Sequence, residues 1–461
     1  MDHRAQRFYN SLQNKRVAFA GIGVSHTELI RQFAQRGLAV IACDRRSRQE
    51  LGELANELEA LGVELRLGGD FFSGLCADVL FRTPGMNWNH PGLRNFRGGG
   101  GVVTSEMEVF FDLCPCEIYA VTGSDGKTTT STLIAELLRA GGRTVHLGGN
   151  IGKALLPCLD EIRPLDAAVV ELSSFQLISM RGSPQVAVVT NVAPNHLDIH
   201  TDMQEYIDSK KNIFLHQNAF STTVLNRDND ITASFAPNLR GRCAWFSLKG
   251  AVERGAYLEG DTLYQALDGR AVPVMTTQDI LLPGIHNVAN YLAAIAALGQ
   301  SLRPETVLRV AREFGGVEHR IEFVREKDGV RWYNDSIATS PTRAIAGLCS
   351  FPEKIILLGG GYDKKIPFEP LAPEIIKHVK LLILTGHTAD KIEAAVRSHP
   401  DYQPDCPQIL RADSVDHAVG LAHAQARPGD VVSLSPACAS FDCYPNFEAR
   451  GRHFKELVNA L

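Results

Sequence analysis

Short apolar runs alternate with longer segments of helical periodicity along nearly the whole chain. The runs contain few polar residues, which is typical of strands buried on both faces of a parallel sheet. This alternation predicts an α/β fold built from doubly wound sheets. The clearest runs are Val17–Ala20, Ala39–Cys43, Ile118–Val121, Ala167–Val170, Val186–Val189, Ile355–Leu358, Leu381–Leu384 and Val431–Leu434.

Breaks in the alternation divide the chain into three predicted domains. The chain has 461 residues, more than one hydrophobic core usually serves. We place the boundaries near Cys114-Pro115-Cys116 and Gly315-Gly316. The prediction is an N-terminal Rossmann-like domain over residues 1–115, a central P-loop-type ATPase domain over 116–316, and a C-terminal Rossmann-like domain over 317–461. Strand-and-turn material over residues 222–277 predicts a small antiparallel sheet within the central domain.

The first domain opens with a strand, a glycine-rich turn and a helix. Gly21-Ile22-Gly23 follows the first strand and Asp44 ends the second, as in a dinucleotide-binding βαβ unit. His26 stands where the third glycine of that fingerprint would be. Three interpretations stay open: an NAD site, a site for a diphosphate ligand such as a nucleotide sugar with Asp44 near its ribose or base, or a corner that binds nothing.

The segment Gly123-Ser124-Asp125-Gly126-Lys127-Thr128-Thr129 lies between a strand and a helix. Its glycines let backbone N–H groups turn toward an anion, while Lys127 supplies an ammonium group and Thr128 a hydroxyl for a metal ion. The strict P-loop pattern has a glycine where this chain has Val121, so the match is to a shortened variant. We predict a nucleotide-phosphate site; the alternative is an ordinary strand-turn-helix corner.

Two further strand ends carry metal-ligating residue types. Glu171 ends a buried strand, and buried carboxylates usually have a partner, so we expect a metal ion or a salt bridge there. His196 follows the next strand; taken alone, it would more often be a structural histidine. Beside a phosphate loop, the pair suits Mg²⁺ or Mn²⁺ that bridges phosphates.

Other polar positions carry weaker signals. The adjacent Lys210 and Lys211 are typical of a solvated helix face. Asn287 and Asn290 share one face at the start of a buried helix, where they would either read a nucleotide base or cap the helix. Polar loops follow the strands of all three domains, which indicates an active site assembled between domains. These loops include Thr83-Pro84-Gly85, Asn334–Arg343, Gly359–Lys365 and Ser435–Asp442.

Composition excludes several classes of partner. With 44 % hydrophobic and 21 % charged residues, the chain is that of an ordinary globular protein, and its net charge of −5 gives no general attraction to nucleic acid or anionic lipid. An anionic substrate must therefore be held by local cations or metal. No signal peptide and no run of 18 apolar residues is present, so we expect a cytoplasmic protein. The ten cysteines include no C-x-x-C pair, and we expect buried, reduced thiols rather than metal or redox sites.

These motifs together resemble the ATP-dependent Mur ligases of peptidoglycan precursor synthesis, and the resemblance covers essentially the whole chain. The shared segments are Thr122–Thr129, Glu171–Gln176, Asn195–Asp198, His286–Asn290 and His319-Arg320. Segments typical of the D-glutamate-adding members are Asn334-Asp335-Ser336 with Ala338-Thr339, Ser435–Ser440, Asn446-Phe447-Glu448 and Arg450-Gly451. The resemblance implies a ligase that uses ATP to add D-glutamate to UDP-N-acetylmuramoyl-L-alanine through an acyl phosphate.

The resemblance also implies roles for individual residues. Lys127, with the loop Gly123–Thr129, would hold the β- and γ-phosphates of ATP, and Thr128 would bind one Mg²⁺. Glu171 and His196 would bind a second Mg²⁺, helped by a carbamate that forms on Lys210 from CO₂. Further nucleotide contacts would come from Asn287 and Asn290, from Arg320 on the phosphates and from Asp335 on the ribose.

For the other two substrates the implied residues lie in the outer domains and beside the phosphate loop. The UDP-sugar would contact Ser25, Asp44, Arg45, Thr83, Pro84, Gly85, Asn150 and Gln176. The D-glutamate would contact Thr339, Lys364, Ser440, Phe441 and Phe447. We expect a monomer that binds these small molecules and neither nucleic acid nor membrane.

One position departs from the family pattern. Some members carry a substrate-binding lysine where this chain has Ile337, so the D-glutamate side chain must be held differently, by Lys364, Lys365 or Arg343. The alternatives to the D-glutamate ligase are an amide ligase that adds a different amino acid, including a folylpolyglutamate-synthase-like enzyme, and a catalytically inactive regulator that binds nucleotide sugars.

Overall fold

The computed structural model describes residues 3–194 and 199–461 and divides the chain into two compact units. The first unit contains residues 1–277 and 289–310, and the second contains residues 278–288 and 311–461. Three sheets organise these units, two in the first and one in the second, which confirms the predicted three-domain α/β fold.

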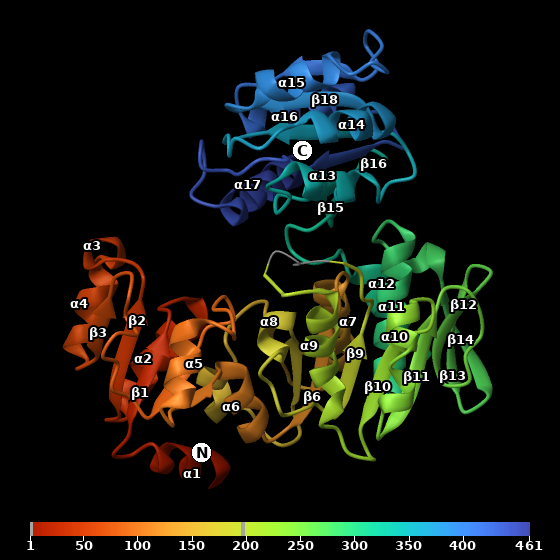
Figure 1. Cartoon of the computed structure of the whole chain (residues 1–461). Coiled ribbons are helices and arrows are strands. Elements are labelled where there is room, and N and C mark those ends of the chain that lie inside the picture. The colour runs from red at the N-terminus through yellow and green to blue at the C-terminus, as the bar shows by residue number, and fades with distance from the viewer. Residues whose placement is uncertain (1–2, 195–198) are drawn as a thin grey trace. The chain divides into compact units, whose positions relative to one another are not determined.

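The first sheet is parallel throughout, with the strand order β3-β2-β1-β4-β5. Its elements are red to orange in Figure 1. The strands are β1 (Arg16–Ala20), β2 (Ala39–Asp44), β3 (Glu64–Leu67), β4 (Val79–Arg82) and β5 (Val102–Thr104), and the helices are α1 (His3–Ser11), α2 (Val24–Gln35), α3 (Arg48–Leu51), α4 (Glu53–Ala60), α5 (Pro91–Gly98) and α6 (Glu106–Leu113). Since β1 pairs with both β2 and β4, the loops that follow β1 and β4 meet at the switch point of the sheet.

His26 explains why the third glycine of the dinucleotide fingerprint is dispensable here. The imidazole is fully buried at the start of α2, with its ring edge-to-face on Phe19 at 5.3 Å between centroids. Its Nδ1 lies 2.9 Å from the Gly21 carbonyl oxygen. In the dinucleotide fingerprint, a glycine at this position lets the backbones of the helix and the strand come into contact. Here α2 packs against β1 through the ring of His26 instead.

The second sheet has nine strands in the order β14-β13-β12-β11-β10-β9-β6-β8-β7. The strands are β6 (Glu117–Thr122), β7 (Val145–Gly149), β8 (Ala167–Glu171), β9 (Val186–Val189), β10 (Thr222–Asn226), β11 (Arg242–Ser247), β12 (Gly255–Glu259), β13 (Thr262–Leu267) and β14 (Arg270–Thr276). The α-helices of this part are α7 (Lys127–Ala140), α8 (Ser174–Leu177), α9 (Met203–Leu215), α10 (Asp230–Ala233), α11 (Ile285–Leu298) and α12 (Pro304–Glu313). Strand β6 pairs with β8 on one side and with β9 on the other.

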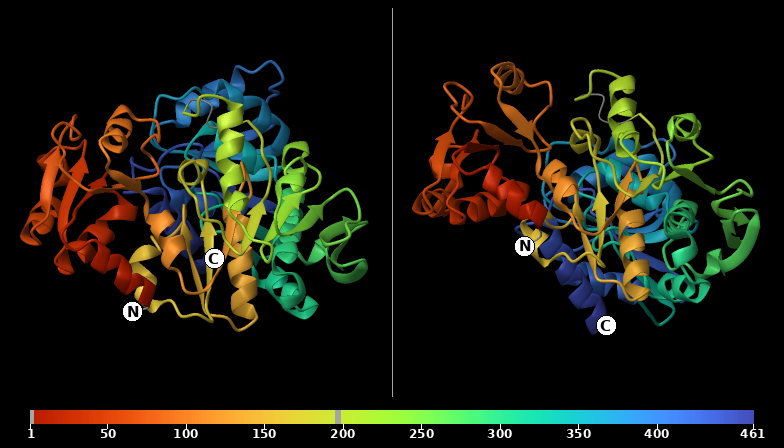
Figure 2. Two further views of the ribbon diagram at one scale, coloured as in Figure 1. Left: turned by 60° about the horizontal axis from the view of Figure 1, so that its bottom comes forward. Right: turned by 90° about the horizontal axis from the view of Figure 1, so that it is seen from below.

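The antiparallel strands β12 to β14 extend this same sheet. Strand β12 pairs in parallel with β11 and antiparallel with β13, so the predicted small sheet is the outer edge of the nine-stranded one. Figure 2 shows these strands in green.

One hydrophobic core serves the first and second sheets together. Phe19 and Phe81 of the first sheet belong to the same cluster as Ile118 and Val170 of the second. Cys114 and Cys116 are part of this core, with their sulfur atoms 3.6 Å apart and no disulfide. The boundary at residues 115 and 116 therefore lies inside a packed region, and it stays a prediction.

The third sheet forms the second unit, in the order β15-β16-β20-β17-β18-β19. Its strands are β15 (Glu322–Lys327), β16 (Val330–Asn334), β17 (Ile355–Gly360), β18 (Val379–Thr385), β19 (Gln408–Arg411) and β20 (Val431–Leu434), and its helices are α13 (Pro341–Leu348), α14 (Ala372–His378), α15 (Ala389–Arg397), α16 (Val415–Gln425) and α17 (Phe447–Ala460). The two edge strands, β15 and β19, were not predicted from the sequence, because their polar residues hide the apolar pattern.

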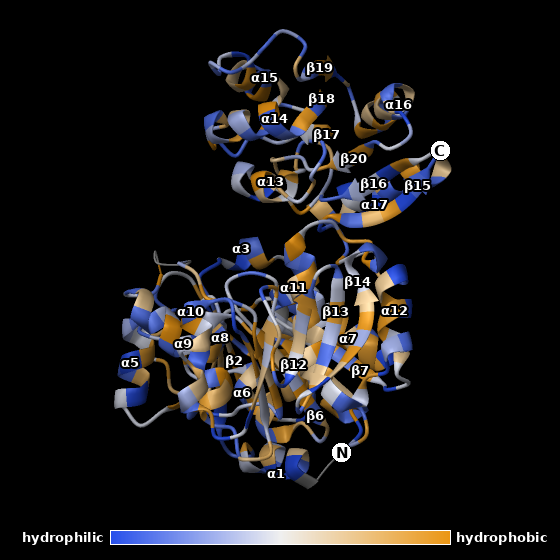
Figure 3. Cartoon of the chain, turned by 90° about the vertical axis from the view of Figure 1, so that its right-hand side faces the viewer, coloured by the Kyte–Doolittle hydropathy of each residue, from blue (hydrophilic) through white to orange (hydrophobic). Residues whose placement is uncertain are grey.

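The helices of the second unit are amphipathic. Figure 3 shows both hydrophobic and hydrophilic residues on α16, where Val415, Ala418 and Val419 are buried and Asp416 and His417 are exposed. No helix among the described residues is long and apolar enough to cross a membrane.

The buried His26 predicts a specific pH dependence of stability. Burial, together with the nearby Arg82 charge, lowers the pKa of His26 to about 4, although its hydrogen bond to Gly21 opposes the shift. Between pH 6.5 and pH 4 the unfolded chain therefore binds a proton that the folded chain does not, and the folded state loses about 1.4 kcal/mol per pH unit. In denaturant titrations at pH 7.5 and pH 4.5, the loss should be smaller for His26→Asn than for the wild type. Equal losses would contradict this assignment.

Candidate functional site

The loop Gly123–Gly126 leaves the carboxyl end of β6 and begins α7. Gly123 has φ +153° and Gly126 has φ +76°, a region that side chains disfavour. A Cβ at Gly123 would collide with the Thr190 hydroxyl, and a Cβ at Gly126 would lie 2.5 Å from Asn290 Oδ1. Both glycines are therefore required by the fold, as the phosphate-loop prediction expected.

Residues that follow β9 hold this loop in place. The Ser124 and Asp125 amides donate to Asn191 Oδ1 at 3.1 and 2.9 Å, and the Thr190 hydroxyl donates to the Asp125 carbonyl. Ser124 Oγ is 3.0 Å from the Tyr206 hydroxyl of α9. The loop is thus preorganised by its own protein contacts.

Two lysines converge on one loop carbonyl. Lys127 Nζ donates to the carbonyl oxygens of Gly123 and Ser124, at 3.1 and 2.9 Å, and Lys210 Nζ donates to the Gly123 oxygen at 2.8 Å. Two ammonium groups this close would repel each other unless an anion lay beside them. The Asp125 and Glu171 carboxylates are near enough to offset part of this repulsion, so the two lysines belong to a cluster of charged groups beside the phosphate loop.

Lys210 is only 1 % exposed, so the predicted solvated face is wrong for this residue. Its ammonium also lies 4.6 Å from the centre of the Tyr206 ring. Burial, with the Lys127 charge, lowers the pKa of Lys210 to about 7. Lys211, by contrast, is partly exposed and forms an ion pair with Asp208 at 2.9 Å.

Glu171 has an oxygen that suits a cation. The residue ends β8 beside Val121 of β6 and is 2 % exposed. Its Oε1 accepts a 2.9 Å hydrogen bond from Asn150 Nδ2, whereas its buried Oε2 has no hydrogen-bond partner among the described residues. Such an oxygen costs stability unless a cation or a further donor reaches it. The predicted salt bridge for Glu171 is not present within the described residues.

The residues near the loop thus fit a divalent cation. Thr128 is buried in the first turn of α7, and Glu171 and Lys210 flank the Gly123 strand end. His196, the remaining predicted ligand, lies outside the described residues.

Asn290 supports the phosphate loop from behind. It is buried on α11, and its Oδ1 accepts a hydrogen bond from the Thr130 hydroxyl at 3.2 Å. Asn287, one turn earlier, donates to the Pro283 carbonyl at 2.7 Å and so fixes the start of α11. Neither contact involves or excludes a nucleotide base.

Six of the eight residues predicted for the UDP-sugar line one cavity of about 320 Å³ in the first unit. These residues are Ser25, Thr83, Pro84, Gly85, Asn150 and Gln176. Thr83 follows β4 and comes within contact distance of Gly21 after β1, as the switch point requires. Asn150 connects this cavity to Glu171, because its Nδ2 donates to Glu171 Oε1 at 2.9 Å.

The other two residues predicted for the UDP-sugar, Asp44 and Arg45, do not line this cavity. Asp44 binds the glycine turn, since its Oδ2 accepts a 2.7 Å hydrogen bond from the Ile22 amide. Its ionic partner is Arg46 at 2.9 Å, whereas Arg45 is exposed. Burial by itself raises the pKa of Asp44, but the hydrogen bonds from Arg46 and Ile22 lower it to about 2. Arg45 and Arg46 both follow Asp44 in the chain, so only the geometry of the turn shows which of them pairs with Asp44.

Two charged residues of the cavity were not identified from sequence. Arg82 ends β4 and donates to the Met86 and Phe175 carbonyls and to Ser179 Oγ at 2.9 to 3.0 Å, and burial lowers its pKa to about 10. Glu106 accepts hydrogen bonds from the Leu155 and Leu156 amides, and burial raises its pKa to about 7. Arg82 could have been identified from the sequence as a charged residue at the end of a buried strand.

In the second unit, three strand ends lie side by side. Strand β20 pairs with β16 on one side and β17 on the other, so the loops after Asn334, Leu434 and Gly360 are neighbours. Asp335 joins two of them, because its Oδ2 accepts a 2.8 Å hydrogen bond from Ser435 Oγ. Burial raises the pKa of Asp335 to about 7, although Ser435 and other donors partly oppose this. Asp335 does not cap α13, which begins after Ser340.

The residues predicted for D-glutamate belong to these loops. Lys364 Nζ donates to the Thr339 carbonyl at 3.2 Å, and Arg343 donates to the Ile337 carbonyl at 3.3 Å. The contacts bring two of the three proposed substitutes for the family lysine next to residues 337–339. For Lys365 the hydrogen bond described is from its backbone amide to Asp363.

Aromatic residues complete this set. Phe441 is 62 % exposed and lies edge-to-face with Tyr362 at 5.8 Å, while Ser440 is buried. Phe447 lies edge-to-face with His319, and its carbonyl accepts a hydrogen bond from Ser336. Arg320 is exposed beside His319.

Arg450 holds these loops together, a role not identified from sequence. Its buried guanidinium donates to Ser336 Oγ and to the carbonyls of Ser336, Cys438 and Ala439 at 2.9 to 3.1 Å. Burial lowers its pKa to about 10. In the sequence, Arg450 stood out only as part of the motif Arg450-Gly451, and the motif did not indicate which groups it contacts.

Comparison with known families gives two matches. Residues 121–298 match the Mur ligase middle domain, and residues 319–438 match the domain described as Mur ligase, glutamate ligase domain.

Curated relatives match over their whole length. The UDP-N-acetylmuramoylalanine–D-glutamate ligase of Acetivibrio thermocellus is 48 % identical over 465 residues, covering 100 % of both chains. The proteins of the same name from Clostridium novyi and Ruminiclostridium cellulolyticum are 48 % and 45 % identical, covering 98 % and 100 % of each chain.

Solved structures share the fold at low sequence identity. The UDP-N-acetylmuramate–alanine ligase of Thermotoga maritima has a TM-score of 0.57 and 16 % identity, covering 97 % of this chain and 100 % of that one. The pseudomurein peptide ligase type C of Methanothermus fervidus has a TM-score of 0.53 and 19 % identity, covering the same shares.

A glycine substitution tests the phosphate loop. Gly126→Ala places a methyl group against Asn290 and strains the backbone, so we expect at least ~10-fold weaker binding of Mg-ADP in calorimetry. Gly142→Ala is the matched control, because Gly142 follows the same helix with φ +91° and open space around it. Both variants should lose about 1 kcal/mol of stability, but only the first should lose affinity. Unchanged affinity in Gly126→Ala would argue against the loop as a phosphate site.

Proposed function

The chain belongs to the Mur ligase family, and we propose that it joins D-glutamate to UDP-N-acetylmuramoyl-L-alanine in an ATP-dependent step of peptidoglycan precursor synthesis. The observation that carries this proposal is the full-length identity of 45 to 48 % to ligases of that name. The cluster of Lys127, Glu171 and Lys210 around the glycine loop supports turnover rather than binding alone.

In the proposed first step, the L-alanine carboxylate attacks the γ-phosphorus of ATP, and ADP leaves. Both reactants are anions, so the site must supply positive charge more than covalent help. Lys127 would supply part of it, because its ammonium group would turn from the loop carbonyls to the β- and γ-phosphates. Arg320 would add a further positive charge. The product of this step is an acyl phosphate.

Magnesium would supply the remaining positive charge. Thr128 would bind one ion, and Glu171 would bind the other through its unpartnered Oε2. His196 and a carbamate on Lys210 are proposed as further ligands of the second ion. When bound, the ions neutralise phosphate charge and align the phosphates.

Lys210 has the surroundings that a carbamate requires. Only a neutral amine reacts with CO₂, and burial against the Lys127 charge lowers the pKa of Lys210 to about 7, so about half of the amines are neutral near that pH. The carbamate would convert a second cation beside Lys127 into an anion. That conversion removes the repulsion between the two lysines.

The residues of the first-unit cavity would hold the UDP-sugar. Ser25 and the loop Thr83-Pro84-Gly85 lie at the switch point of the first sheet, where α/β sheets bind ligands. Asp44 would reach the ligand through the glycine turn that it holds. Asn150 and Gln176 would reach toward the muramoyl-alanine arm, which puts its carboxylate near Glu171.

In the proposed second step, the D-glutamate amine attacks the acyl carbon, and phosphate leaves. Thr339, Lys364, Ser440, Phe441 and Phe447 would bind the amino acid, with Arg343 as a further candidate for a carboxylate. Arg450 positions the loops that carry Ser336 and Ala439. We further propose that the protein acts as a monomer in the cytoplasm, where ATP is available.

Release of ADP tests the substrate assignment. The purified protein with ATP, Mg²⁺ and UDP-N-acetylmuramoyl-L-alanine should release ADP over many turnovers only when D-glutamate is added, and other D- and L-amino acids should not support turnover. Release with another amino acid would move the protein to a different specificity within the family. No release with any amino acid would leave a nucleotide-sugar-binding regulator.

Substitution of Lys210, with substitution of Lys211 as the control, tests the proposed carbamate. Lys210→Ala should reduce turnover at least ~100-fold, because the second ion loses a ligand, and added short carboxylates should restore part of it. The matched control is Lys211→Ala, at the partly exposed neighbouring lysine, which should change turnover less than about twofold. With ¹³C-bicarbonate, a carbamate carbon signal should appear in the wild type and not in Lys210→Ala. A fully active Lys210→Ala would refute the carbamate.

A further inference from the structure

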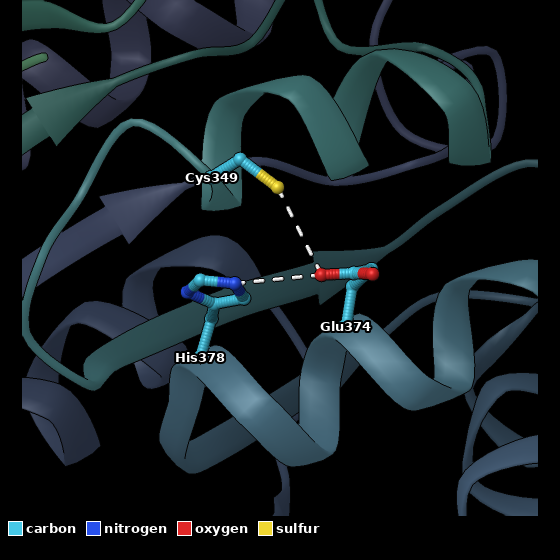
Figure 4. Close-up of side chains that lie close together, drawn as sticks. All are labelled: Cys349, Glu374 and His378. Atoms are coloured by element: carbon cyan, nitrogen blue, oxygen red, sulfur yellow. Dashed lines mark hydrogen bonds and ion pairs between the residues drawn. The ribbon is translucent and has the colours of Figure 1, made fainter. Parts of the chain in front are cut away.

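The second unit contains a cluster of three metal-ligating side chains outside the residues proposed for the ligase. Cys349 caps the carboxyl end of α13. Glu374 and His378 lie one turn apart on α14, so their side chains share a face. Figure 4 shows the three side chains converging from the two helices.

The geometry of the cluster suits a small cation. One potential ligand atom from each residue lies within 4.8 Å of the other two. Glu374 Oε2 lies 3.8 Å from Cys349 Sγ and 3.4 Å from His378 Nε2. His378 Nε2 is buried, and it forms no hydrogen bond of good geometry with any described residue. A cation between the three atoms would satisfy this nitrogen and draw the three ligand atoms closer to one another.

We propose that Cys349, Glu374 and His378 form a binding site for a thiophilic divalent cation, with Zn²⁺ as the natural occupant and water completing the tetrahedron. A sulfur, an imidazole nitrogen and one carboxylate oxygen form a donor set that Zn²⁺ and Co²⁺ prefer. Mg²⁺ prefers oxygen ligands alone, so the site would not compete for the ion that serves ATP.

A bound cation would take the place of the thiol proton that Cys349 directs at Glu374 Oε2.

A cation bound to these three residues would link helix α13 to helix α14. Helix α13 begins just after Thr339 and carries Arg343, both proposed for the amino-acid substrate. Fixing its other end to α14 would stabilise this part of the second unit. Binding to the folded state alone would raise the melting temperature in proportion to the logarithm of the metal concentration.

Cobalt spectroscopy tests the site directly. The full-length protein, reduced and freed of metal by a chelator, is titrated with Co²⁺ in the presence of saturating Mg²⁺. We expect one equivalent to produce a thiolate-to-cobalt charge-transfer band in the near ultraviolet and d–d bands of tetrahedral intensity, and Zn²⁺ to abolish both.

Three variants separate this site from other thiols. Cys349→Ser should abolish the charge-transfer band, and His378→Gln should weaken binding at least ~10-fold through the loss of one ligand. Cys76→Ser, which removes an exposed thiol in the first unit, should leave the titration unchanged. Circular dichroism of each variant checks that the fold is intact.

The same titration can overturn the proposal. A band that persists in Cys349→Ser, a wild-type titration without a thiolate band, or weak uptake of several equivalents would each assign the cluster to hydrogen bonding alone. Because the readout is metal binding, ligase turnover does not enter the result.

Discussion

Parallel pairing of β6 with β8 on one side and β9 on the other is the constraint on which the candidate site depends. The pairing brings the ends of all three strands to one edge of the sheet, so Gly123, Glu171 and Thr190 become neighbours although 67 residues separate the first from the last. Thr190 and Asn191 then hold the loop, because Asn191 Oδ1 accepts hydrogen bonds from the Ser124 and Asp125 amides and the Thr190 hydroxyl donates to the Asp125 carbonyl. The third sheet has the same arrangement: β20 pairs in parallel with β16 on one side and β17 on the other, so the ends of these three strands are also neighbours.

Buried charges follow from this arrangement, and each is held in a particular way. Arg82 and Arg450 donate mainly to backbone carbonyls, so they fix the loops that supply those carbonyls, although Arg82 Nε has no hydrogen-bond partner among the described residues. Glu171 and Lys210 make fewer contacts: one carboxylate oxygen of Glu171 has no hydrogen-bond partner among the described residues, and the Lys210 amine shares one carbonyl with Lys127. Desolvation costs of this kind persist where ligands or ions complete the site. Arg82 and Arg450 therefore maintain the shape of the loops, whereas Glu171 and Lys210 are suited to chemistry.

Cys114 and Cys116 of the first unit and Cys349 of the second show that one residue type can serve different purposes. Cys114 and Cys116 belong to the core shared by two sheets and act as small apolar residues. Cys349 is exposed at a helix end, beside a carboxylate and an imidazole. The number and spacing of the cysteines in the chain predicted buried thiols without a metal, since no two of them are spaced as zinc ligands. The burial is wrong for Cys76, Cys349, Cys406 and Cys443, which are exposed.

The sequence by itself determined the order of strands and helices, the glycine loops and the chemistry at strand ends, because these depend on local periodicity and on backbone conformations that glycine permits. Only the tertiary structure decided which side chains meet. Lys210 reaches the Gly123 carbonyl across 87 residues, Asp44 pairs with Arg46 rather than Arg45, and Cys349 meets two residues of another helix. The edge strands β15 and β19 were also missed, since a strand paired on one side can carry polar residues. Contacts of this kind arise from the packing of distant elements, and the periodicity of a single segment contains no information about its partners.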